Sequence, residues 1–432
     1  MEEKSRARDS SIVIRGGKPL SGVVEVRGAK NVALPLLAAT LLTREECIID
    51  NLPLIEDVFR MIEILKKLGA EITWERKRRL KVKCSKISPE NLPCEIVGYF
   101  RGSILVLGPL LARFGKLKIS PPGGCLIGAR PLDTHLDAFR QLGFKISAKN
   151  GFYFFEKDKK LWSRKKKEVI FREFSVTATE NILLYSSFFP EKIDLKIADV
   201  DYENQELIKV LNKMGARIRV SGHHQFTVTG SKNLKGFSHK LISDPIETGT
   251  FIIMGLATKS EITIKKAELS YLTLFLKRLK DFGARFEILK KDIIKVFPSN
   301  RIKMDKIQSL PYPGIHTDLQ PELGVLATQT KGPTLIHDPL YEGRLKYLEI
   351  LNKMGADIIF CDPHRAIING PSTLRGIEIF TPDLRAGAAL IIAGLVARGE
   401  TIIHNVGQID RGYEKIEERI QKLKGEVKRI YS

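Results

Sequence analysis

Two kinds of hydrophobic segment alternate along this chain. The first kind is amphipathic and ends in Leu, Met or Phe followed by Gly-Ala or a close variant, after which a short segment of alternating hydrophobicity begins. A glycine at this place is typical of a helix end, where it takes a left-handed backbone conformation. This motif occurs five times, and its glycines are separated by 74, 72, 68 and 72 residues: Gly69, Gly143, Gly215, Gly283 and Gly355.

A sixth, less regular copy closes the chain at Leu423-Lys424-Gly425. Lys424 stands 69 residues after Gly355, at the position that glycine holds in the other copies. In the second copy, Phe144 replaces the alanine. We expect local packing to account for Phe144 and a relaxed chain end to account for Lys424.

The second kind of segment is apolar nearly all round and rich in small residues. Its copies begin near Asn31, Gly102, Thr177, Thr248, Leu319 and Leu384. A helix that is apolar on all sides is buried. Short alternating segments between the helices, such as Val23–Val26 and Thr401–Ile403, predict strands.

Each repeat is therefore expected to hold two helices and about four short strands. Six such repeats could stack as a solenoid, but their period exceeds the roughly 20 to 50 residues usual for solenoids. A chain of 432 residues also favours two domains. We therefore expect an α/β protein of two domains, each of three repeats, with buried helices inside and small sheets and amphipathic helices outside.

The composition is that of a soluble globular protein, with 43% hydrophobic and 28% charged residues. No apolar run is long enough to span a membrane, and the charged start, Met1 to Ser11, reads as a short disordered tail rather than a secretory signal. Five cysteines, an odd number without a CxxC pair, argue against disulfides and a zinc site and favour a reducing cytoplasm. His223 and His224 lack a third ligand at metal-binding spacing.

The net charge of +21 admits a polyanionic partner, acidic small substrates or a solvated basic surface. The basic runs, such as 76–79 and 164–167, lack interleaved aromatic residues, and no known nucleic-acid-binding motif is present. We interpret the runs as solvated faces. Binding to nucleic acid remains the alternative from another class, and a filter-binding assay against salt distinguishes it, because binding to phosphate backbones falls steeply with salt.

The loop from Pro121 to His135 carries the most suggestive chemistry. It places Cys125 among prolines and glycines and Arg130 five residues later, and Pro131 then opens a helical pattern. A thiol just ahead of a helix N-terminus and near a cation has a lowered pKa and becomes nucleophilic. The alternative is a surface turn with an incidental cysteine.

Cations also stand at the starts of the buried helices, where the helix dipole opposes them. Lys30, Arg101 and Arg385 are the clearest cases. A shared anionic ligand in a common cleft would offset this placement. The alternative is that each cation pairs with a neighbouring carboxylate.

Eight separate motifs then match a known family in order. They are Arg27–Asn31, Pro121–His135, Ser175-Val176, Ile246–Thr250, Thr317–Gln320, Glu342–Arg344, Asp383–Arg385 and Asp410–Glu414. Over residues 12 to 428 the chain resembles the UDP-N-acetylglucosamine 1-carboxyvinyltransferases, of the enolpyruvyl transferase family. The resemblance implies an inside-out α/β barrel fold, with residues 1–29 and 243–432 in one domain, residues 30–242 with the Cys loop in the other, and an active site in the cleft between them.

The resemblance also implies residue roles. It implies that Cys125 attacks phosphoenolpyruvate and gives its methylene carbon a proton, that Asp318 removes a proton from the sugar 3-hydroxyl, and that Lys30 and Arg411 complete the catalytic set. Phosphoenolpyruvate contacts are implied for Lys30, Arg130, Arg344, Arg385 and Arg411. Contacts to the sugar nucleotide are implied for Asn31, Arg101, Arg130, Pro131, Leu132, Asp133, Thr134, Ser175, Val176, Asp318 and Leu340.

The implied reaction transfers the enolpyruvyl group of phosphoenolpyruvate to UDP-N-acetylglucosamine with loss of phosphate, the first committed step of peptidoglycan precursor synthesis and a target of fosfomycin. The resemblance implies no cofactor, no metal, a cytoplasmic protein and a monomer or weak oligomer. Glu173 departs from the pattern, because some relatives carry a basic residue there, so affinity for the diphosphate is in doubt. The alternative within the class is 5-enolpyruvylshikimate-3-phosphate synthase, which lacks the Cys-bearing loop.

Overall fold

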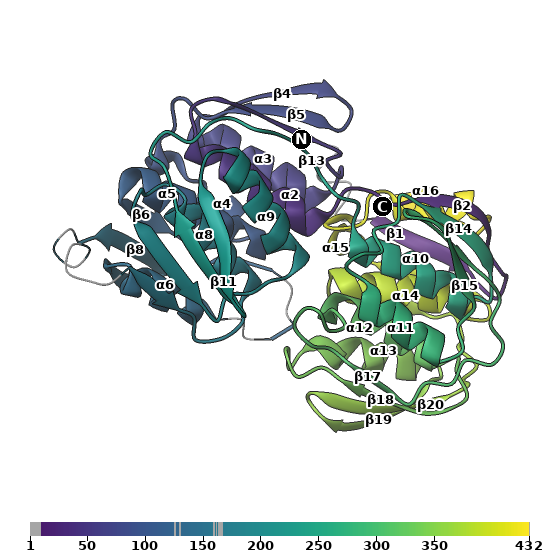
Figure 1. Cartoon of the computed structure of the whole chain (residues 1–432). Coiled ribbons are helices and arrows are strands. Elements are labelled where there is room, and N and C mark those ends of the chain that lie inside the picture. The colour runs from purple at the N-terminus through teal and green to yellow at the C-terminus, as the bar shows by residue number, and fades with distance from the viewer. Residues whose placement is uncertain are drawn as a thin grey trace. The chain divides into compact units, whose positions relative to one another are not determined.

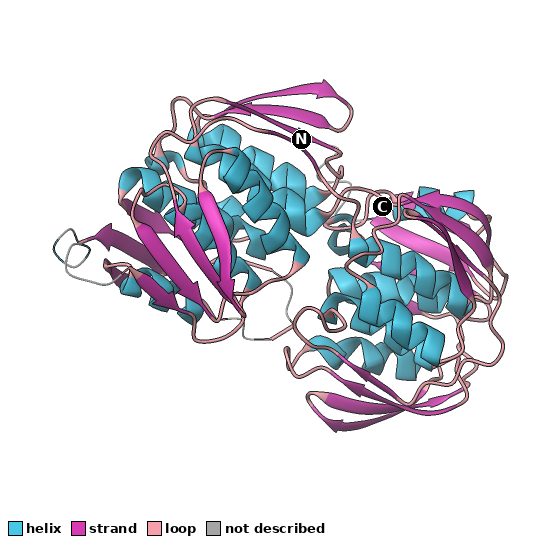
Figure 2. Ribbon diagram, viewed as in Figure 1, coloured by secondary structure: helices cyan, strands magenta, loops and turns pink. Residues whose placement is uncertain are grey.

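The computed structural model describes residues 10–124, 127–128, 131–158, 160, 162 and 167–431. The described chain divides into two units, which are treated separately below (Figure 1). Unit 1 holds the residues up to Arg27, Ile127 with Gly128, and the residues from Ser243 onward; unit 2 holds the rest. In each unit small sheets lie around the helices (Figure 2).

Each unit is built from three copies of one pattern. A copy has an inner helix, a strand, an outer helix and two further strands, and in five of the six copies a short strand runs parallel to the first strand at the edge of the sheet. Five sheets accordingly have four strands, and the remaining sheet, ordered β6-β8-β7, has three among the described residues. The expected two helices and about four strands in each repeat are thus confirmed, with one strand fewer in that copy.

Unit 1 contains the following elements. The first copy comprises β2 (Ser21–Glu25), α10 (Pro245–Ala257), β14 (Glu261–Lys265), α11 (Thr273–Asp281), β15 (Phe286–Lys290) and β16 (Ile293–Val296). The second comprises β17 (Lys306–Gln308), η4 (Thr317–Leu319), α12 (Gln320–Ala327), β18 (Gly332–His337), η5 (Arg344–Lys346), α13 (Tyr347–Lys353), β19 (Asp357–Asp362) and β20 (Arg365–Gly370). The third comprises β21 (Glu378–Phe380), α14 (Leu384–Val396), β22 (Glu400–His404), α15 (Gly407–Asp410), α16 (Ile416–Lys422), β23 (Glu426–Tyr431) and β1 (Ser10–Arg15).

Unit 2 repeats the pattern. Its first copy comprises β13 (Ser238–Lys240), α2 (Lys30–Ala39), η1 (Thr40–Leu42), β3 (Glu46–Asp50), α3 (Glu56–Leu68), β4 (Glu71–Arg76), β5 (Arg79–Lys83), η2 (Pro89–Asn91) and α4 (Cys94–Val97). The second comprises η3 (Arg101–Val106), α5 (Leu107–Phe114), β6 (Lys116–Ile119), α6 (Asp133–Gln141), β7 (Phe144–Lys149) and β8 (Phe152–Lys157). The third comprises β9 (Glu168–Ile170), α8 (Val176–Ser186), β10 (Lys192–Lys196), α9 (Tyr202–Lys213), β11 (Arg217–Gly222) and β12 (Gln225–Thr229).

Strands distant in sequence complete three of these sheets. In unit 1, β1 lies between β22 and β23 and pairs antiparallel with both, and β2 pairs parallel with β14. In unit 2, β13 pairs parallel with β3, almost two hundred residues earlier. The N-terminal strands therefore belong to the sheets of unit 1.

The inner helices α2, α5, α8, α10, α12 and α14 are buried as their composition predicts. Every residue of α10 and α12 is buried, and so is α14 from Leu384 to Leu395. Small residues allow close packing: a Cβ on Gly324 would lie 1.9 Å from the Tyr347 hydroxyl oxygen. Two helix starts differ from the prediction. Arg101 begins the 3-10 segment η3 ahead of α5, and α6 begins at Asp133 rather than at Pro131.

The recurring glycines take the left-handed conformation that the sequence predicts, with φ between 85° and 108° in all five copies. Lys424 holds the same conformation in the sixth copy, with φ of 62°. The expectation of a relaxed chain end is wrong, because β23 follows at once and pairs with β1 from Glu426 to Tyr431. A non-glycine residue in this conformation costs about 1 kcal/mol or more.

The division into units differs in detail from the predicted domain boundaries. Gly28 and Ala29 lie with unit 2, where the Ala29 N–H donates to the Ile242 carbonyl (2.9 Å). Ile127 and Gly128, expected with the second domain, group with unit 1, where the Gly343 N–H donates to the Ile127 carbonyl (2.9 Å). Among the residues described, no helix is both long and apolar enough to cross a membrane.

Candidate active site

In unit 1, Asp318 lies between two buried arginines. Arg344 Nη2 donates to Asp318 Oδ1 (3.0 Å), and Arg385 Nε donates to Oδ2 (2.9 Å). The arginine side chains are 3% and 5% exposed, whereas Asp318 is 19% exposed. The carboxylate is thus the member of this group that solvent reaches most easily.

Helix-capping bonds fix the backbone on which these side chains stand. Asp383 caps α14 by accepting from the N–H groups of Arg385 (2.9 Å) and Ala386 (3.1 Å). The His316 ring accepts from the N–H of Asp318 (3.0 Å) at the start of η4. Side-chain oxygens satisfy the first N–H groups of a helix in this way, so the position of Arg385 follows from local sequence.

Arg344 is held by a second polar chain. Its Nε donates to Thr317 Oγ1 (3.1 Å), and Thr317 in turn donates to Asp338 Oδ2 (2.5 Å). Burial lowers the pKa of the Arg344 guanidinium, but the charges of Asp318, Asp383 and Asp338 outweigh burial and raise this pKa above its ordinary value. Arg344 therefore stays charged.

Arg385 behaves in the same way. Burial lowers the pKa of its guanidinium, and the opposing charges, of which Asp318 is the largest, raise it well above the ordinary value. Two permanent cations on one partly exposed carboxylate make a site that suits an anionic ligand next to a proton acceptor.

Two further residues of unit 1 were expected to contact substrates. Arg411 follows α15, and its Nη1 donates to Gln408 Oε1 (3.0 Å). Leu340 has a 38% exposed side chain, and its N–H donates to Asp338 Oδ1 (3.0 Å). Asp338 thus joins the Leu340 segment to Thr317 and, through it, to Arg344.

In unit 2, the start of α2 presents Lys30 and Asn31. Lys30 Nζ lies 3.0 Å from Asp57 Oδ2, in the first turn of α3. Asn31 Nδ2 donates to Glu203 Oε1 (2.9 Å), in the first turn of α9. Both contacts join the start of the inner helix to the start of an outer helix.

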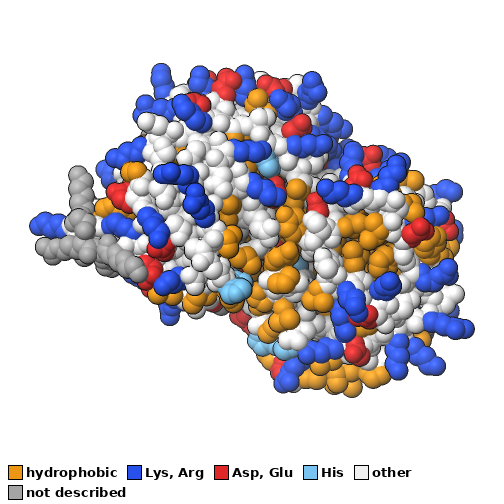
Figure 3. Space-filling view, viewed as in Figure 1, with side chains coloured by type: hydrophobic (Ala, Val, Ile, Leu, Met, Phe, Trp, Pro, Cys, Tyr) orange, Lys and Arg blue, Asp and Glu red, His pale blue; other side chains and the backbone are white. Residues whose placement is uncertain are grey.

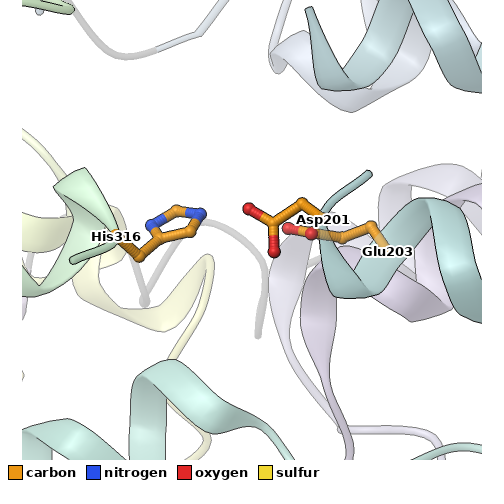
Figure 4. A group of neighbouring side chains, drawn as sticks. All are labelled: Asp201, Glu203 and His316. Carbon is orange, nitrogen blue, oxygen red and sulfur yellow. The ribbon is translucent and has the colours of Figure 1, made fainter. Parts of the chain in front are cut away.

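Glu203 belongs to a buried group of carboxyls near the start of α9, where Figure 4 labels it with Asp201. Burial, followed by the charges of Asp201, Glu180 and Asp199, raises the pKa of the Glu203 carboxyl well above its ordinary value. The pKa of the Glu180 carboxyl, on α8, is also raised well above its ordinary value, again mainly by burial. Neighbouring acids that share a low-dielectric site favour protonation of some of them.

The segment expected to meet the sugar nucleotide lies around α6 and α8. Arg101 Nη2 donates to the Pro131 carbonyl (3.1 Å), Leu132 is buried, and Asp133 is exposed. Ser175 caps α8 by accepting from the Ala178 N–H (3.4 Å), and Val176 is the first residue of that helix.

Glu173, the departure from the family pattern, has a partner. Its Oε1 accepts a hydrogen bond from Thr134 Oγ1 (2.7 Å). It thus ties the start of α6 to the segment before α8. Cys125 and Arg130 lie outside the described residues.

The cations at the helix starts are therefore paired or hydrogen-bonded inside their own units. Lys30 pairs with Asp57, and Arg385 shares Asp318 with Arg344, so two of the three named cations have the neighbouring carboxylate that the alternative expects, whereas Arg101 donates to a backbone carbonyl. The shared anionic ligand stays a prediction. Sequence reasoning missed Asp57, Glu203, Glu322 and Tyr413 as partners. For Glu322 the sequence did carry a signal: a charged residue inside a helix whose other positions are nearly all apolar indicates a buried polar contact.

On the face that Figure 3 shows, Lys and Arg side chains are spread over both units and stand among Asp and Glu. This distribution agrees with the interpretation of the basic runs as solvated faces.

A model of the family described as EPSP synthase (3-phosphoshikimate 1-carboxyvinyltransferase) matches residues 14–420. The chain belongs to this family. Among its relatives, UDP-N-acetylglucosamine 1-carboxyvinyltransferase of Coxiella burnetii is 38% identical over 421 residues, covering 98% of this chain and 96% of the relative. Proteins of the same name from Magnetococcus marinus (37%, covering 97% and 99%) and Treponema denticola (38%, covering 95% and 97%) are similarly close.

Solved structures share the fold. The enolpyruvyl transferase NikO from Streptomyces tendae matches with a TM-score of 0.88 at 22% identity, covering 98% of this chain and 99% of its own. EPSP synthase from Acinetobacter baumannii matches with a TM-score of 0.74 at 16% identity, covering 98% and 100%. The expected fold, with two domains of three repeats, is confirmed.

Proposed function

We propose that this protein transfers the enolpyruvyl group of phosphoenolpyruvate to the 3-hydroxyl of UDP-N-acetylglucosamine and releases phosphate, as the first committed step of peptidoglycan precursor synthesis in the cytoplasm. The observation that carries the proposal is the 37–38% identity, over at least 95% of the chain, with relatives that bear the name of this transferase. The Asp318 group supports it, because it offers a proton acceptor beside two permanent cations.

In the proposed reaction, Asp318 takes the proton of the sugar 3-hydroxyl while the hydroxyl oxygen adds to C2 of phosphoenolpyruvate. A proton is added to C3, and Cys125 is the proposed donor. In the second step, C3 loses a proton and the C2–O bond to phosphate breaks, which leaves the enolpyruvyl ether and inorganic phosphate. The reaction has no net oxidation, so it requires no redox cofactor.

Arg344 and Arg385 have two roles in this proposal. With no ligand they hold Asp318: Arg344 Nη2 lies 3.0 Å from Oδ1, and Nε and Nη2 of Arg385 both lie 2.9 Å from Oδ2. Anionic phosphoenolpyruvate competes for the same guanidinium groups, which weakens both ion pairs and leaves the carboxylate available to the hydroxyl proton. Substrate binding and activation of the base are then one event.

The remaining proposed contacts come from both units. Lys30, Arg130 and Arg411 are proposed to bind the phosphate of phosphoenolpyruvate. Asn31, Arg101, residues 130–134, Ser175, Val176 and Leu340 are proposed to bind the sugar nucleotide. The exposed carboxylate of Glu173 is expected to weaken binding of a diphosphate, because like charges repel.

Phosphate release tests the proposal. The purified protein is incubated with phosphoenolpyruvate and either UDP-N-acetylglucosamine or shikimate 3-phosphate, the acceptor that the family description suggests as the second candidate. We expect release with the sugar nucleotide only, and much less from Cys125→Ala. Release with shikimate 3-phosphate alone would establish the second candidate.

Covalent labelling gives a second measurement. Fosfomycin is expected to alkylate Cys125, which the intact mass of the protein reports. An unchanged mass in the presence of UDP-N-acetylglucosamine contradicts the proposed role of Cys125. Cys361, which is exposed, provides the internal control: its substitution by Ser leaves the mass shift in place.

A further inference from the structure

Behind Asp318, three inner helices of unit 1 bring buried polar side chains together. Thr250 lies in α10, Glu322 in the first turn of α12, and Arg385 at the start of α14. Tyr413, just after α15, completes the group and is fully buried. Four polar groups in an apolar core are costly unless they bind one another, so their arrangement calls for an explanation.

The hydrogen bonds form one continuous chain that ends on Asp318. Tyr413 Oη donates to Glu322 Oε1 (3.2 Å) and accepts from Arg385 Nη1 (3.1 Å). Arg385 Nε then donates to Asp318 Oδ2 (2.9 Å). Thr250 Oγ1 lies 3.1 Å from Glu322 Oε1 and 2.9 Å from Tyr413 Oη, which secures the buried end.

The directions of these bonds follow from the donors available. Arginine has no acceptor, so the Tyr413 oxygen accepts from it and the Tyr413 proton points to Glu322. Burial, and next the charge of Glu322, raise the pKa of the Tyr413 hydroxyl well above its ordinary value, so Tyr413 keeps this proton. Glu322 Oε2 is buried without a hydrogen-bond partner, which leaves Oε1 as the contact through which Glu322 acts.

The segment that carries Tyr413 is itself anchored. The Tyr413 N–H donates to the Ile409 carbonyl (3.0 Å), and a Cβ on Gly412 would lie 2.7 Å from a Leu384 methyl carbon. Arg429 of β23 donates to both oxygens of Asp410 (2.8 and 2.6 Å). Tyr413 therefore has little freedom to follow Arg385 if Arg385 moves.

We propose that Tyr413 and Glu322 are positioning residues that fix the Arg385 guanidinium against Asp318, and that they thereby set the orientation of the proposed base. The inference rests on the proposed function for its catalytic meaning. Asp318 touches the substrate in that function, whereas Tyr413 and Glu322 act through Arg385. Nε and Nη2 of Arg385 both lie 2.9 Å from Asp318 Oδ2, and the bond from Nη1 to Tyr413 supports the opposite side of the guanidinium, so that it cannot tilt about this single oxygen.

Tyr413→Phe and Tyr347→Phe form a matched pair for the test. Both hydroxyls are buried in unit 1, but the Tyr347 hydroxyl accepts from Gln320 (2.9 Å) and lies outside the chain of bonds to Asp318. We expect kcat for phosphate release to fall about tenfold in Tyr413→Phe, with KM for UDP-N-acetylglucosamine nearly unchanged, because a misplaced base affects the chemical step. Tyr347→Phe is expected to keep kcat within twofold. An unchanged kcat in Tyr413→Phe overturns the inference.

A second readout is independent of turnover. The Nε–H proton NMR signal of Arg385, assigned by its loss in Arg385→Lys, reports whether the guanidinium is held. We expect this signal to broaden in Tyr413→Phe and to persist in Tyr347→Phe. If the wild-type protein releases no phosphate with either acceptor, the proposed function fails, and the NMR comparison alone decides the positioning contact; an unaltered Arg385 signal in Tyr413→Phe overturns it.

The pH profile separates positioning from mere packing. The charged and titratable groups that face Glu322 are Arg385 of α14, Asp318 of η4, Tyr413 and Tyr347 of α13. Ionised Glu322 accepts more strongly from the Tyr413 hydroxyl, which makes the Tyr413 oxygen a better acceptor for Arg385 and holds the guanidinium more firmly, so kcat is expected to rise as the pH passes through about 7. Glu322→Gln is expected to lose this rise while retaining the fold. An identical profile in wild type and Glu322→Gln contradicts the role of Glu322.

Discussion

In unit 1 several polar side chains of the inner helices bind one another, whereas in unit 2 Lys30 and Asn31 at the start of α2 bind the starts of outer helices. Arg385 of α14 reaches Asp318 ahead of α12, and Thr250 of α10 reaches Glu322. Lys30 and Asn31 of α2 reach instead Asp57 of α3 and Glu203 of α9. The same repeat thus supports two different polar networks.

This difference shows that the repeat determines the backbone conformation of each copy but not the polar partners of its side chains. Backbone geometry recurs in all six copies, down to the left-handed residue after each outer helix. The side-chain contacts that join the start of an inner helix to another helix differ between the units, because each depends on which residue types occupy equivalent positions on facing helices. Unit 1 collects two guanidinium groups around one carboxylate, while unit 2 collects several buried carboxyls near one amide.

The largest expected effect compares the two ion-pair centres. Asp318→Asn leaves two guanidinium groups buried without their shared counterion, so we expect the free energy of unfolding to fall by about 3 kcal/mol. Asp57→Asn removes the partner of Lys30, whose side chain is 13% exposed and can turn to water, and we expect a loss of about 1 kcal/mol. Urea denaturation of both variants measures the difference; equal losses would remove the distinction between the two units.

Glu322 makes the stability of unit 1 depend on pH. Burial raises the pKa of this carboxyl from 4.5 to about 7, so the native state binds its proton more tightly than the unfolded state does. Its contribution to stability is therefore present below pH 4.5 and is lost as the pH rises through 7, by about 3 kcal/mol in total.

Glu322→Gln should remove this dependence. We expect the variant to gain stability relative to wild type between pH 5 and pH 8, as measured by chemical denaturation at several pH values. A stability difference between the two proteins that stays constant over this range would show that Glu322 does not titrate there.

A smaller effect compares the caps of two inner helices. Asp244 caps α10 of unit 1 by accepting from the N–H groups of Ile246 (2.8 Å) and Glu247 (3.2 Å), whereas Ser175 caps α8 of unit 2 through one longer bond of 3.4 Å. We expect Asp244→Ala to cost about 1–2 kcal/mol and Ser175→Ala about 0.5 kcal/mol. Thermal unfolding measures the loss of stability in each variant. A larger loss in Ser175→Ala than in Asp244→Ala would contradict the expectation that the cap with two shorter bonds contributes more.

The smallest expected effect restores the repeat at its one exception. Lys424 holds the left-handed conformation that glycine holds in the other five copies. Lys424→Gly is expected to raise the free energy of unfolding by up to about 1 kcal/mol, because the strain of a side chain disappears. Gly355→Lys, the reverse change in the neighbouring copy, serves as the control and is expected to destabilise by a similar amount.

Much of the fold could be predicted from sequence because its signals are local. The glycine at the end of each outer helix and the nearly uniform apolar character of the inner helices follow from residues within one turn. Burial of α10 and α14 accordingly came out as predicted. The pairing of β1 and β2 within the sheets of unit 1 could not be predicted from periodicity, because β1 pairs with strands near the other end of the chain and Ser21 of β2 pairs with Glu261, which lies 240 residues later.

The candidate site was less predictable for the same reason. Arg385 and Asp318 are 67 residues apart, and Asn31 and Glu203 are 172 residues apart, so no local pattern links them. Their identity as polar residues at helix starts was visible, but their partners depend on how repeats pack. Family resemblance supplied roles for Arg385, Asp318, Asn31, Cys125 and Arg130 but none for Glu203, and these roles remain predictions.

The placement of β1 and β2 has a consequence for synthesis on the ribosome. Unit 2 has its strands, including β13, within residues 28–242, so it can fold as soon as that stretch has emerged. The strand β1, which leaves the ribosome first, has no partner until β22 and β23 appear near the end of translation. The strand that is synthesised first therefore stays unpaired until the last strands are synthesised. A chaperone that shields an unpaired N-terminal strand is expected to assist the folding of unit 1 more than that of unit 2.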